Sequence, residues 1–97
     1  MSDDLRAAVL AAVADVNLQL PDERRLADAD TTPVLAAGST LDSLATLNLL
    51  VGVEERCAAL GLDVALLDEA LLAYPDGPLA TLGTLVAHLA AVRAAAG

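Results

Sequence analysis

The sequence predicts an all-α fold, and three observations point to it. Phe and Trp are absent and Tyr74 is the only aromatic residue, so the core has to be built from Leu, Val and Ala, a mixture that favours helices over strands. Apolar residues recur at helical spacing in several segments, and Pro and Gly punctuate the chain between them. A length of 97 residues with 57% hydrophobic residues indicates one domain, residues 1–97, with a small core.

The first helix is expected over residues 3–19. Ser2 is its candidate N-cap, and acidic residues follow in the first turn. The apolar residues at helical spacing are Leu5, Val9, Val13, Val16 and Leu20. Pro21 ends this helix, and residues 22–41 contain no long periodic segment, although a short helical turn is expected to open at Pro21. A long first loop is therefore predicted.

The second helix is expected over residues 43–60. Asp42 is a strong N-cap type, because its carboxylate accepts hydrogen bonds from amides left without partners at a helix start, and Ser43 is then the first helical residue. Gly61 is in the position of a C-terminal stop. The predicted apolar side consists of Leu44, Leu47, Leu50, Val51 and Ala58, and the other face carries Asn48, Glu55 and Arg56.

Two further helices follow. A short one is expected over residues 65–73, where it holds Asp68 and Glu69 and stops before a Pro-Asp-Gly-Pro turn signal. A fourth is expected over residues 79–94, with Arg93 favourably placed near the negative end of the helix dipole. These helices predict a small four-helix bundle with a long first loop and a short third helix.

Charge and cysteine content limit the class of protein. The net charge is −9 and the chain has no lysine, which argues against nucleic acid and anionic membrane as partners and favours basic partner surfaces. The longest charge-free run, residues 77–92, is shorter than the roughly 20 residues needed to span a bilayer. Cys57 is the only cysteine and no signal peptide is recognisable, so a cytoplasmic location is expected.

One stretch, residues 38–44, reads Gly-Ser-Thr-Leu-Asp-Ser-Leu. A phosphate esterified to Ser43 would lie at a helix N-terminus, where an anion is favoured. Leu41-Asp42-Ser43-Leu44, followed by Asn48-Leu49-Leu50-Val51 and Val53-Glu54-Glu55, resembles the acyl carrier proteins. Leu66-Leu67-Asp68-Glu69 and Pro78-Leu79-Ala80-Thr81-Leu82 are similar to segments of discrete, stand-alone members of that family.

The resemblance implies a carrier without catalytic activity of its own. Ser43 would carry covalent 4′-phosphopantetheine, Asp42 would cap the helix and help the modifying transferase engage, and Leu44 would make an apolar contact with that enzyme. The implied cargo is an acyl thioester of fatty-acid, polyketide or related secondary-metabolite biosynthesis. The implied partners are a phosphopantetheinyl transferase and acyl- or aminoacyl-loading and condensing or transferring enzymes, which act on a monomer. The long loop would cross the bundle on three apolar anchors, Leu26, Val34 and Leu35.

Partner enzymes of this family commonly present Lys and Arg to acidic positions on the second helix, which favours the rate of encounter. Here Ala45 and Asn48 occupy positions where acyl carriers often have Asp or Glu. The predicted partner surface therefore combines residues of two helices: Asn48, Glu55, Asp68 and Glu69.

Other interpretations of the same residues remain. An aminoacyl or peptidyl carrier of a non-ribosomal pathway is one alternative, and an unmodified acidic helical adaptor is another. A serine hydrolase needs a base beside Ser43, but the only histidine is His88 on the fourth predicted helix and no nucleophile elbow surrounds the serine. One His and one Cys do not make a zinc site, so no metal is expected.

Two interpretations concern apolar residues. Cys57 is predicted to be a small packing residue of the second helix. The seam between the second and fourth helices either opens for an acyl chain or is a packed core. The residues expected along this seam are Leu47, Leu50, Val51, Leu85 and Leu89.

Overall fold

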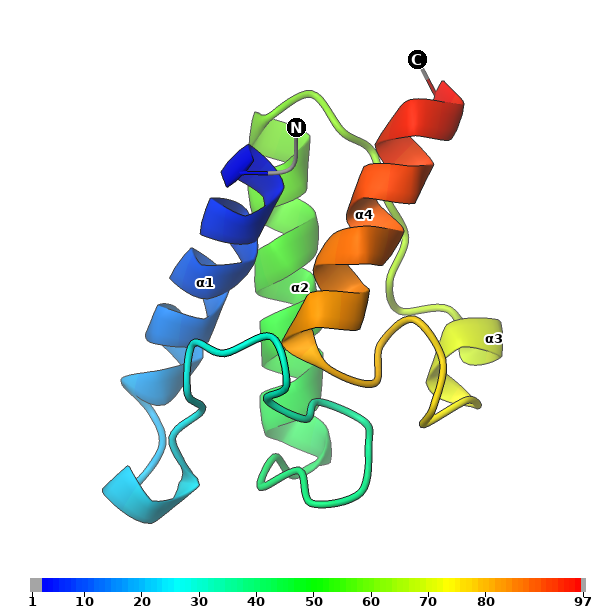
Figure 1. Cartoon of the computed structure of the whole chain (residues 1–97). Coiled ribbons are helices and arrows are strands. Elements are labelled where there is room, and N and C mark those ends of the chain that lie inside the picture. The colour runs from blue at the N-terminus through cyan, green and yellow to red at the C-terminus, as the bar shows by residue number, and fades with distance from the viewer. Residues whose placement is uncertain (1–2, 97) are drawn as a thin grey trace.

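The computed structural model describes residues 3–96. These residues form four α-helices and a short 3₁₀ turn: α1 (Asp3–Asn17), η1 (Asp22–Arg24), α2 (Ser43–Ala59), α3 (Glu69–Leu72) and α4 (Leu82–Ala96). The described residues include no strand, and one isolated bridge joins Pro33 with Thr81. The predicted all-α class is confirmed. α1 packs against both α2 and α4, and Figure 1 shows the short α3 standing apart from the three long helices.

The core is built from one face of each long helix together with residues of the connections. Leu5, Leu49, Leu85 and Leu89 are fully buried, and burying a leucine side chain contributes about 1.5–3 kcal/mol to folding. Cys57 is also fully buried, as predicted for a packing residue. These contacts fix the axis of α2, on which the Asp-Ser-Leu sequence lies.

The buried face of α2 differs from the predicted one. Leu50 is buried, but Leu44 and Leu47 are 66% and 45% exposed, Val51 is half-buried and Ala58 is exposed. The buried side chains are Ala45, Leu49, Leu50, Val53 and Cys57. The prediction was wrong because apolar residues occupy nearly all sides of this helix, so their spacing does not select one face.

The long loop is held by its apolar anchors. Leu26 and Val34 are buried and Leu35 is half-buried against the core, as expected. The Asn17 side chain fixes Leu26 through two hydrogen bonds, donating to its carbonyl at 3.0 Å and accepting from its amide at 2.8 Å. These two hydrogen bonds lie at the end of α1, which stops at Asn17 and not at residue 19 as predicted. Ser2, the predicted N-cap, lies outside the described residues.

The end of the same loop pairs with the segment before α4. The Val34 amide donates to the Ala80 carbonyl at 2.7 Å and the Leu35 amide donates to the Leu79 carbonyl at 3.1 Å. Residues 79–81 form a turn, a bend and the isolated bridge residue, so α4 begins at Leu82 and not at residue 79, where the sequence predicted it. Thr81 precedes the first helical residue, and its hydroxyl accepts from the Thr84 amide at 3.2 Å, as the side chain of a helix cap does.

The third predicted helix is reduced to the four residues of α3. Asp68 is its N-cap and accepts from the Ala70 amide at 2.8 Å, so the residues before Asp68 remain outside the helix. Among them, Leu66 donates its amide to the Glu54 carboxylate of α2 at 2.6 Å. This contact gives the Leu66 amide a partner outside its own segment.

Four of the five arginines form ion pairs with acidic residues, and three of these pairs join different elements. The pairs are Arg6–Asp30, Arg25–Asp22, Arg56–Asp15 and Arg93–Asp4. All are on the surface, where such pairs contribute little individually. They nevertheless leave most of the negative charge of the chain uncompensated.

The Asp4–Arg93 pair between the ends of α1 and α4 predicts a pH dependence of stability. Hydrogen bonds from Arg93, at 2.6 and 3.0 Å, hold the pKa of Asp4 below its ordinary value of 3.8. Because the folded-state pKa is lowered, the stabilisation is present above the unfolded-state pKa and is lost as the pH falls through the folded-state pKa. Asp4→Asn should therefore weaken the dependence of the unfolding free energy on pH below about 5, measured by urea denaturation.

Asp3→Asn is the control, because it removes a charge beside the pair and leaves the pair in place. An acid profile of Asp4→Asn that overlays the wild-type profile would contradict the assignment.

Candidate functional site

Ser43 is the first residue of α2 and is exposed. Asp42 before it is the N-cap, with extended backbone (φ −82°, ψ 178°) and a carboxylate that accepts from the Ala45 amide at 2.7 Å. The Thr46 hydroxyl donates to the Asp42 carbonyl at 2.9 Å. The cap satisfies one of the amides that lack a partner at a helix start. The predicted positions of both residues in the helix are confirmed.

The chain leading to Ser43 is fixed by hydrogen bonds. Ser39 accepts from the Leu41 amide at 3.2 Å, and the Thr40 hydroxyl donates to the Arg24 carbonyl at 2.8 Å. Leu41 is half-buried against the core. The serine is therefore presented by a capped helix that follows an anchored loop.

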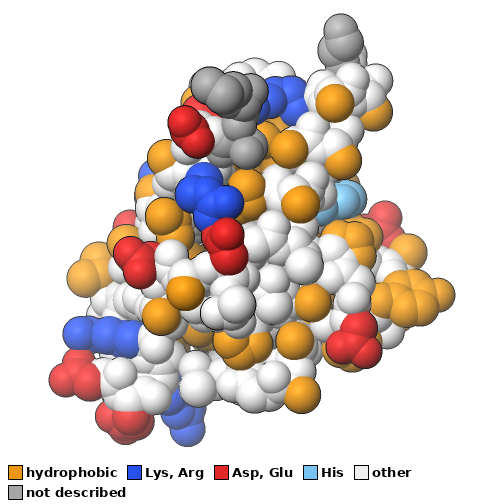
Figure 2. All heavy atoms as spheres, viewed as in Figure 1, with side chains coloured by type: hydrophobic (Ala, Val, Ile, Leu, Met, Phe, Trp, Pro, Cys, Tyr) orange, Lys and Arg blue, Asp and Glu red, His pale blue; other side chains and the backbone are white. Residues whose placement is uncertain are grey.

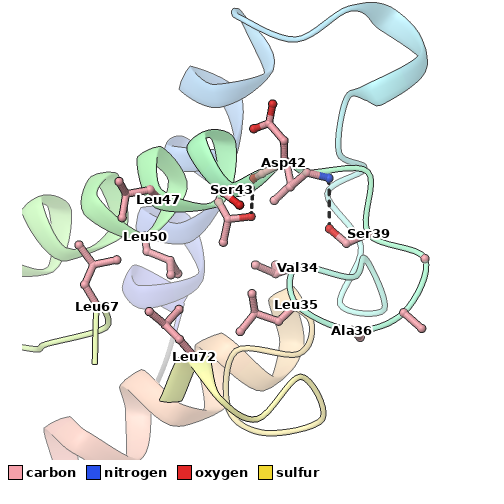
Figure 3. Close-up of a pocket in the computed structure, with 14 residues that line it drawn as sticks. Val34, Leu35, Ala36, Ser39, Asp42, Ser43, Leu47, Leu50, Leu67 and Leu72 are labelled. Atoms are coloured by element: carbon pink, nitrogen blue, oxygen red, sulfur yellow. Dashed lines mark hydrogen bonds between the residues drawn. The ribbon is translucent and has the colours of Figure 1, made fainter. Parts of the chain in front are cut away.

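A cleft of about 550 Å³ opens beside Ser43. One wall is α2, with Ser43, Thr46, Leu47 and Leu50. A second wall is the long loop, including Val34, Leu35 and Ser39, and a third contains Leu67 and Leu72 from the segment around α3. Figure 3 shows Ser43 in the wall of this space, with leucines from the other two walls facing it. The lining of the cleft combines aliphatic side chains with the polar groups of Ser39, Asp42, Ser43 and Thr46.

The position of this cleft corrects the predicted acyl-chain seam. Leu85 and Leu89 are fully buried in the core, so the seam between α2 and α4 is filled. Leu47 and Leu50 line the cleft, but they face the long loop and the α3 segment. Val34, Leu67 and Leu72 were missed as cleft residues because the walls come from segments far apart in the sequence.

Few ionisable side chains line the cleft. Asp42 is the only residue with an ionisable carboxylate, imidazole, thiol or amine side chain among those that line it, and its carboxylate is engaged in the helix cap. A serine needs an adjacent base to act as a nucleophile, and His88, on α4, does not line the cleft. Burial raises the pKa of the Cys57 thiol, which disfavours the reactive thiolate.

The four predicted partner residues fall into two groups. Asn48 and Glu55 are exposed and line a groove of about 200 Å³ between α1 and α2. Asp68 and Glu69 begin α3, which Figure 1 shows on the other side of the molecule from α1. The two pairs therefore do not make one continuous patch.

Leu44, which was predicted to make an apolar contact with the transferase, is 66% exposed. It lines a small hollow between the α1–α2 groove and the start of α2, together with Gln19 and Asn48. A partner that reaches Ser43 can therefore contact Leu44 directly. Figure 2 shows acidic, basic and hydrophobic side chains over α1 and η1, and hydrophobic and acidic side chains around α3.

In residues 3–96, no group of three or more His, Cys, Asp and Glu side chains is arranged to hold a metal ion. Within the same range, none of the helices has the length and apolar character required to cross a membrane. Comparisons of this chain with protein-family models, curated proteins and solved structures gave no match.

Proposed function

We propose that this chain is an acyl carrier protein that carries 4′-phosphopantetheine on Ser43 and holds acyl intermediates as thioesters at the end of that arm. The observation that carries the proposal is the position of Ser43, which is exposed in the first turn of a capped helix and borders a cleft. The four helices, long first loop and short third helix support it, since this is the bundle expected of the family.

The helix start suits a phosphodiester for electrostatic reasons. The N-terminus of α2 has partial positive charge and amides without helical partners, which favour an anion on the side chain of the first helical residue. Asp42 brings negative charge near the same position, but its carboxylate already accepts the Ala45 amide. Asp42 and Leu44 are proposed to contact the phosphopantetheinyl transferase, and Leu44 does so through its exposed side chain.

A carrier presents its cargo to other enzymes and leaves the chemistry to them. The cleft contains no base that would activate a nucleophile, and this supports a role in presentation. The proposed partners are a phosphopantetheinyl transferase and loading, condensing or transferring enzymes of fatty-acid, polyketide or related biosynthesis. Leu47, Leu67 and Leu72 give the cleft apolar surface that an acyl chain can contact, and this supports acyl cargo.

The proposal is tested by intact mass after co-expression with a broad-specificity phosphopantetheinyl transferase. The wild type is expected to gain the mass of one phosphopantetheinyl group, and Ser43→Ala is expected to gain none. Ser39→Ala is the matched control, because it removes another hydroxyl that borders the same cleft, and it should be modified like the wild type. An unchanged wild-type mass would rule out the carrier and favour the unmodified acidic adaptor.

A further inference from the structure

The third wall of the cleft belongs to residues 67–78, which we call the lid. α3 lies within it, and none of its residues is buried. The residues that flank it, Leu66 and Leu79, are both fully buried. Apart from Leu71, which is half-buried against the core, the lid is fixed to the core at its two ends. Segments with few buried apolar contacts open at low free-energy cost.

The two ends of the lid are tied in different ways. Its C-terminal end is joined to the long loop by backbone hydrogen bonds from Val34, Leu35 and Ala36 to the carbonyls of Leu79 and Ala80, at 2.7 to 3.1 Å. At its N-terminal end, the Leu66 amide donates to the Glu54 carboxylate of α2 at 2.6 Å. One side chain therefore links the lid to the α2 wall.

The surroundings of the hydrogen bond between Glu54 and Leu66 strengthen it. Glu54 is half-buried, so its carboxylate is partly shielded from competing water. A hydrogen bond to an ionised acceptor is roughly twice as strong as one between neutral groups. Leu67, the next residue after Leu66, lines the cleft with Leu47 of α2, so a shift of Leu66 away from Glu54 also moves a cleft wall.

We propose that Glu54 is a positioning residue that holds the lid against α2, and that loss of its contact with Leu66 loosens the wall of the cleft beside Ser43. The lid then controls how much of the interior of the cleft is accessible from that serine. A role of the lid toward cargo on Ser43 rests on the proposed carrier function. The contact between Glu54 and Leu66 is present in the unmodified chain and does not depend on that function.

The test is amide hydrogen exchange, followed by NMR on the unmodified protein. In Glu54→Ala, the amides of Leu66 and of residues 70–73, which are hydrogen-bonded at the α3 turn, are expected to exchange about tenfold faster or more, the factor that corresponds to losing one charge-assisted hydrogen bond. Core amides of α1 and α2, such as those of Val9 and Val53, are expected to keep their wild-type rates.

Two variants make this result specific. Glu55→Ala removes the same charge from the next residue, which is exposed, and should leave exchange in the lid unchanged. Glu54→Gln keeps a neutral oxygen acceptor, which forms a weaker hydrogen bond than the carboxylate, and should therefore exchange at rates between those of the wild type and Glu54→Ala. It also provides the comparison if Glu54→Ala does not fold.

Three outcomes would overturn the proposal: wild-type exchange in the lid of Glu54→Ala, equal acceleration throughout its chain, or equal effects of Glu54→Ala and Glu55→Ala. If only the glutamine variant folds, unchanged exchange at Leu66 in that variant would also overturn it. None of these measurements involves modification of Ser43, so failure of the carrier function would be seen separately in the mass experiment.

Discussion

Replacing Leu89 with alanine is expected to lower the free energy of unfolding by about 2–5 kcal/mol. Leu89 is fully buried on α4, within the core that joins the three long helices. The change removes apolar contacts and leaves a cavity that rigid helix packing fills only in part. Urea denaturation followed by circular dichroism measures the loss as a shift of the midpoint at unchanged slope.

Leu47→Ala is the matched control, with the same chemical change on the cleft wall. Leu47 is 45% exposed, so its replacement should cost no more than about 1 kcal/mol. The two residues belonged to one predicted seam, and the structure assigns them to different environments. Losses of similar size in the two variants would contradict that separation.

Gly83→Ala is expected to destabilise the fold by about 1–3 kcal/mol, the range for overpacking. A Cβ at this position would lie 3.0 Å from both the Cβ and the carbonyl oxygen of Asp30. The same carbonyl accepts the Gly83 amide at 2.9 Å, and the Thr32 carbonyl accepts the Leu82 amide at 3.0 Å. The loop cannot move away without weakening the bonds that hold it across the start of α4.

Gly52→Ala is expected to stabilise the fold. Its Cβ would meet only the Ala12 Cβ, at the ordinary distance of 3.5 Å, and alanine is favoured over glycine inside a helix by about 0.5–1 kcal/mol. Thermal unfolding of the two variants compares these effects directly. A stabilising Gly83→Ala would contradict the close approach of the loop to α4.

The parts of the site that depend on local rules were predictable from the sequence. Asp42 is a preferred N-cap residue and Ser43 follows it, so the start of α2 needed no tertiary information. Gly61 also ends α2 as predicted, with φ +83° and a hydrogen bond from its amide to the Ala58 carbonyl at 3.0 Å. These residues obey preferences that act over a few neighbouring positions.

The parts that depend on packing were not predictable. α2 has leucines and valines on nearly every side, so only its neighbours decide that Leu49 is buried and Leu47 is exposed. The position of Leu66 depends on a contact with Glu54, twelve residues away in the sequence, which no local rule predicts. The cleft is formed where α2, the long loop and the segment around α3 meet. No local pattern in the sequence marks that meeting point.

The central claim is that Ser43 holds the phosphopantetheine arm. Peptide-level tandem mass spectrometry of the wild-type chain, after co-expression with the transferase, tests it most directly. We predict that the phosphopantetheinyl group is found on the peptide that contains Ser43 and is released from that residue on fragmentation. An unmodified peptide, or a group located on another residue, would contradict the claim.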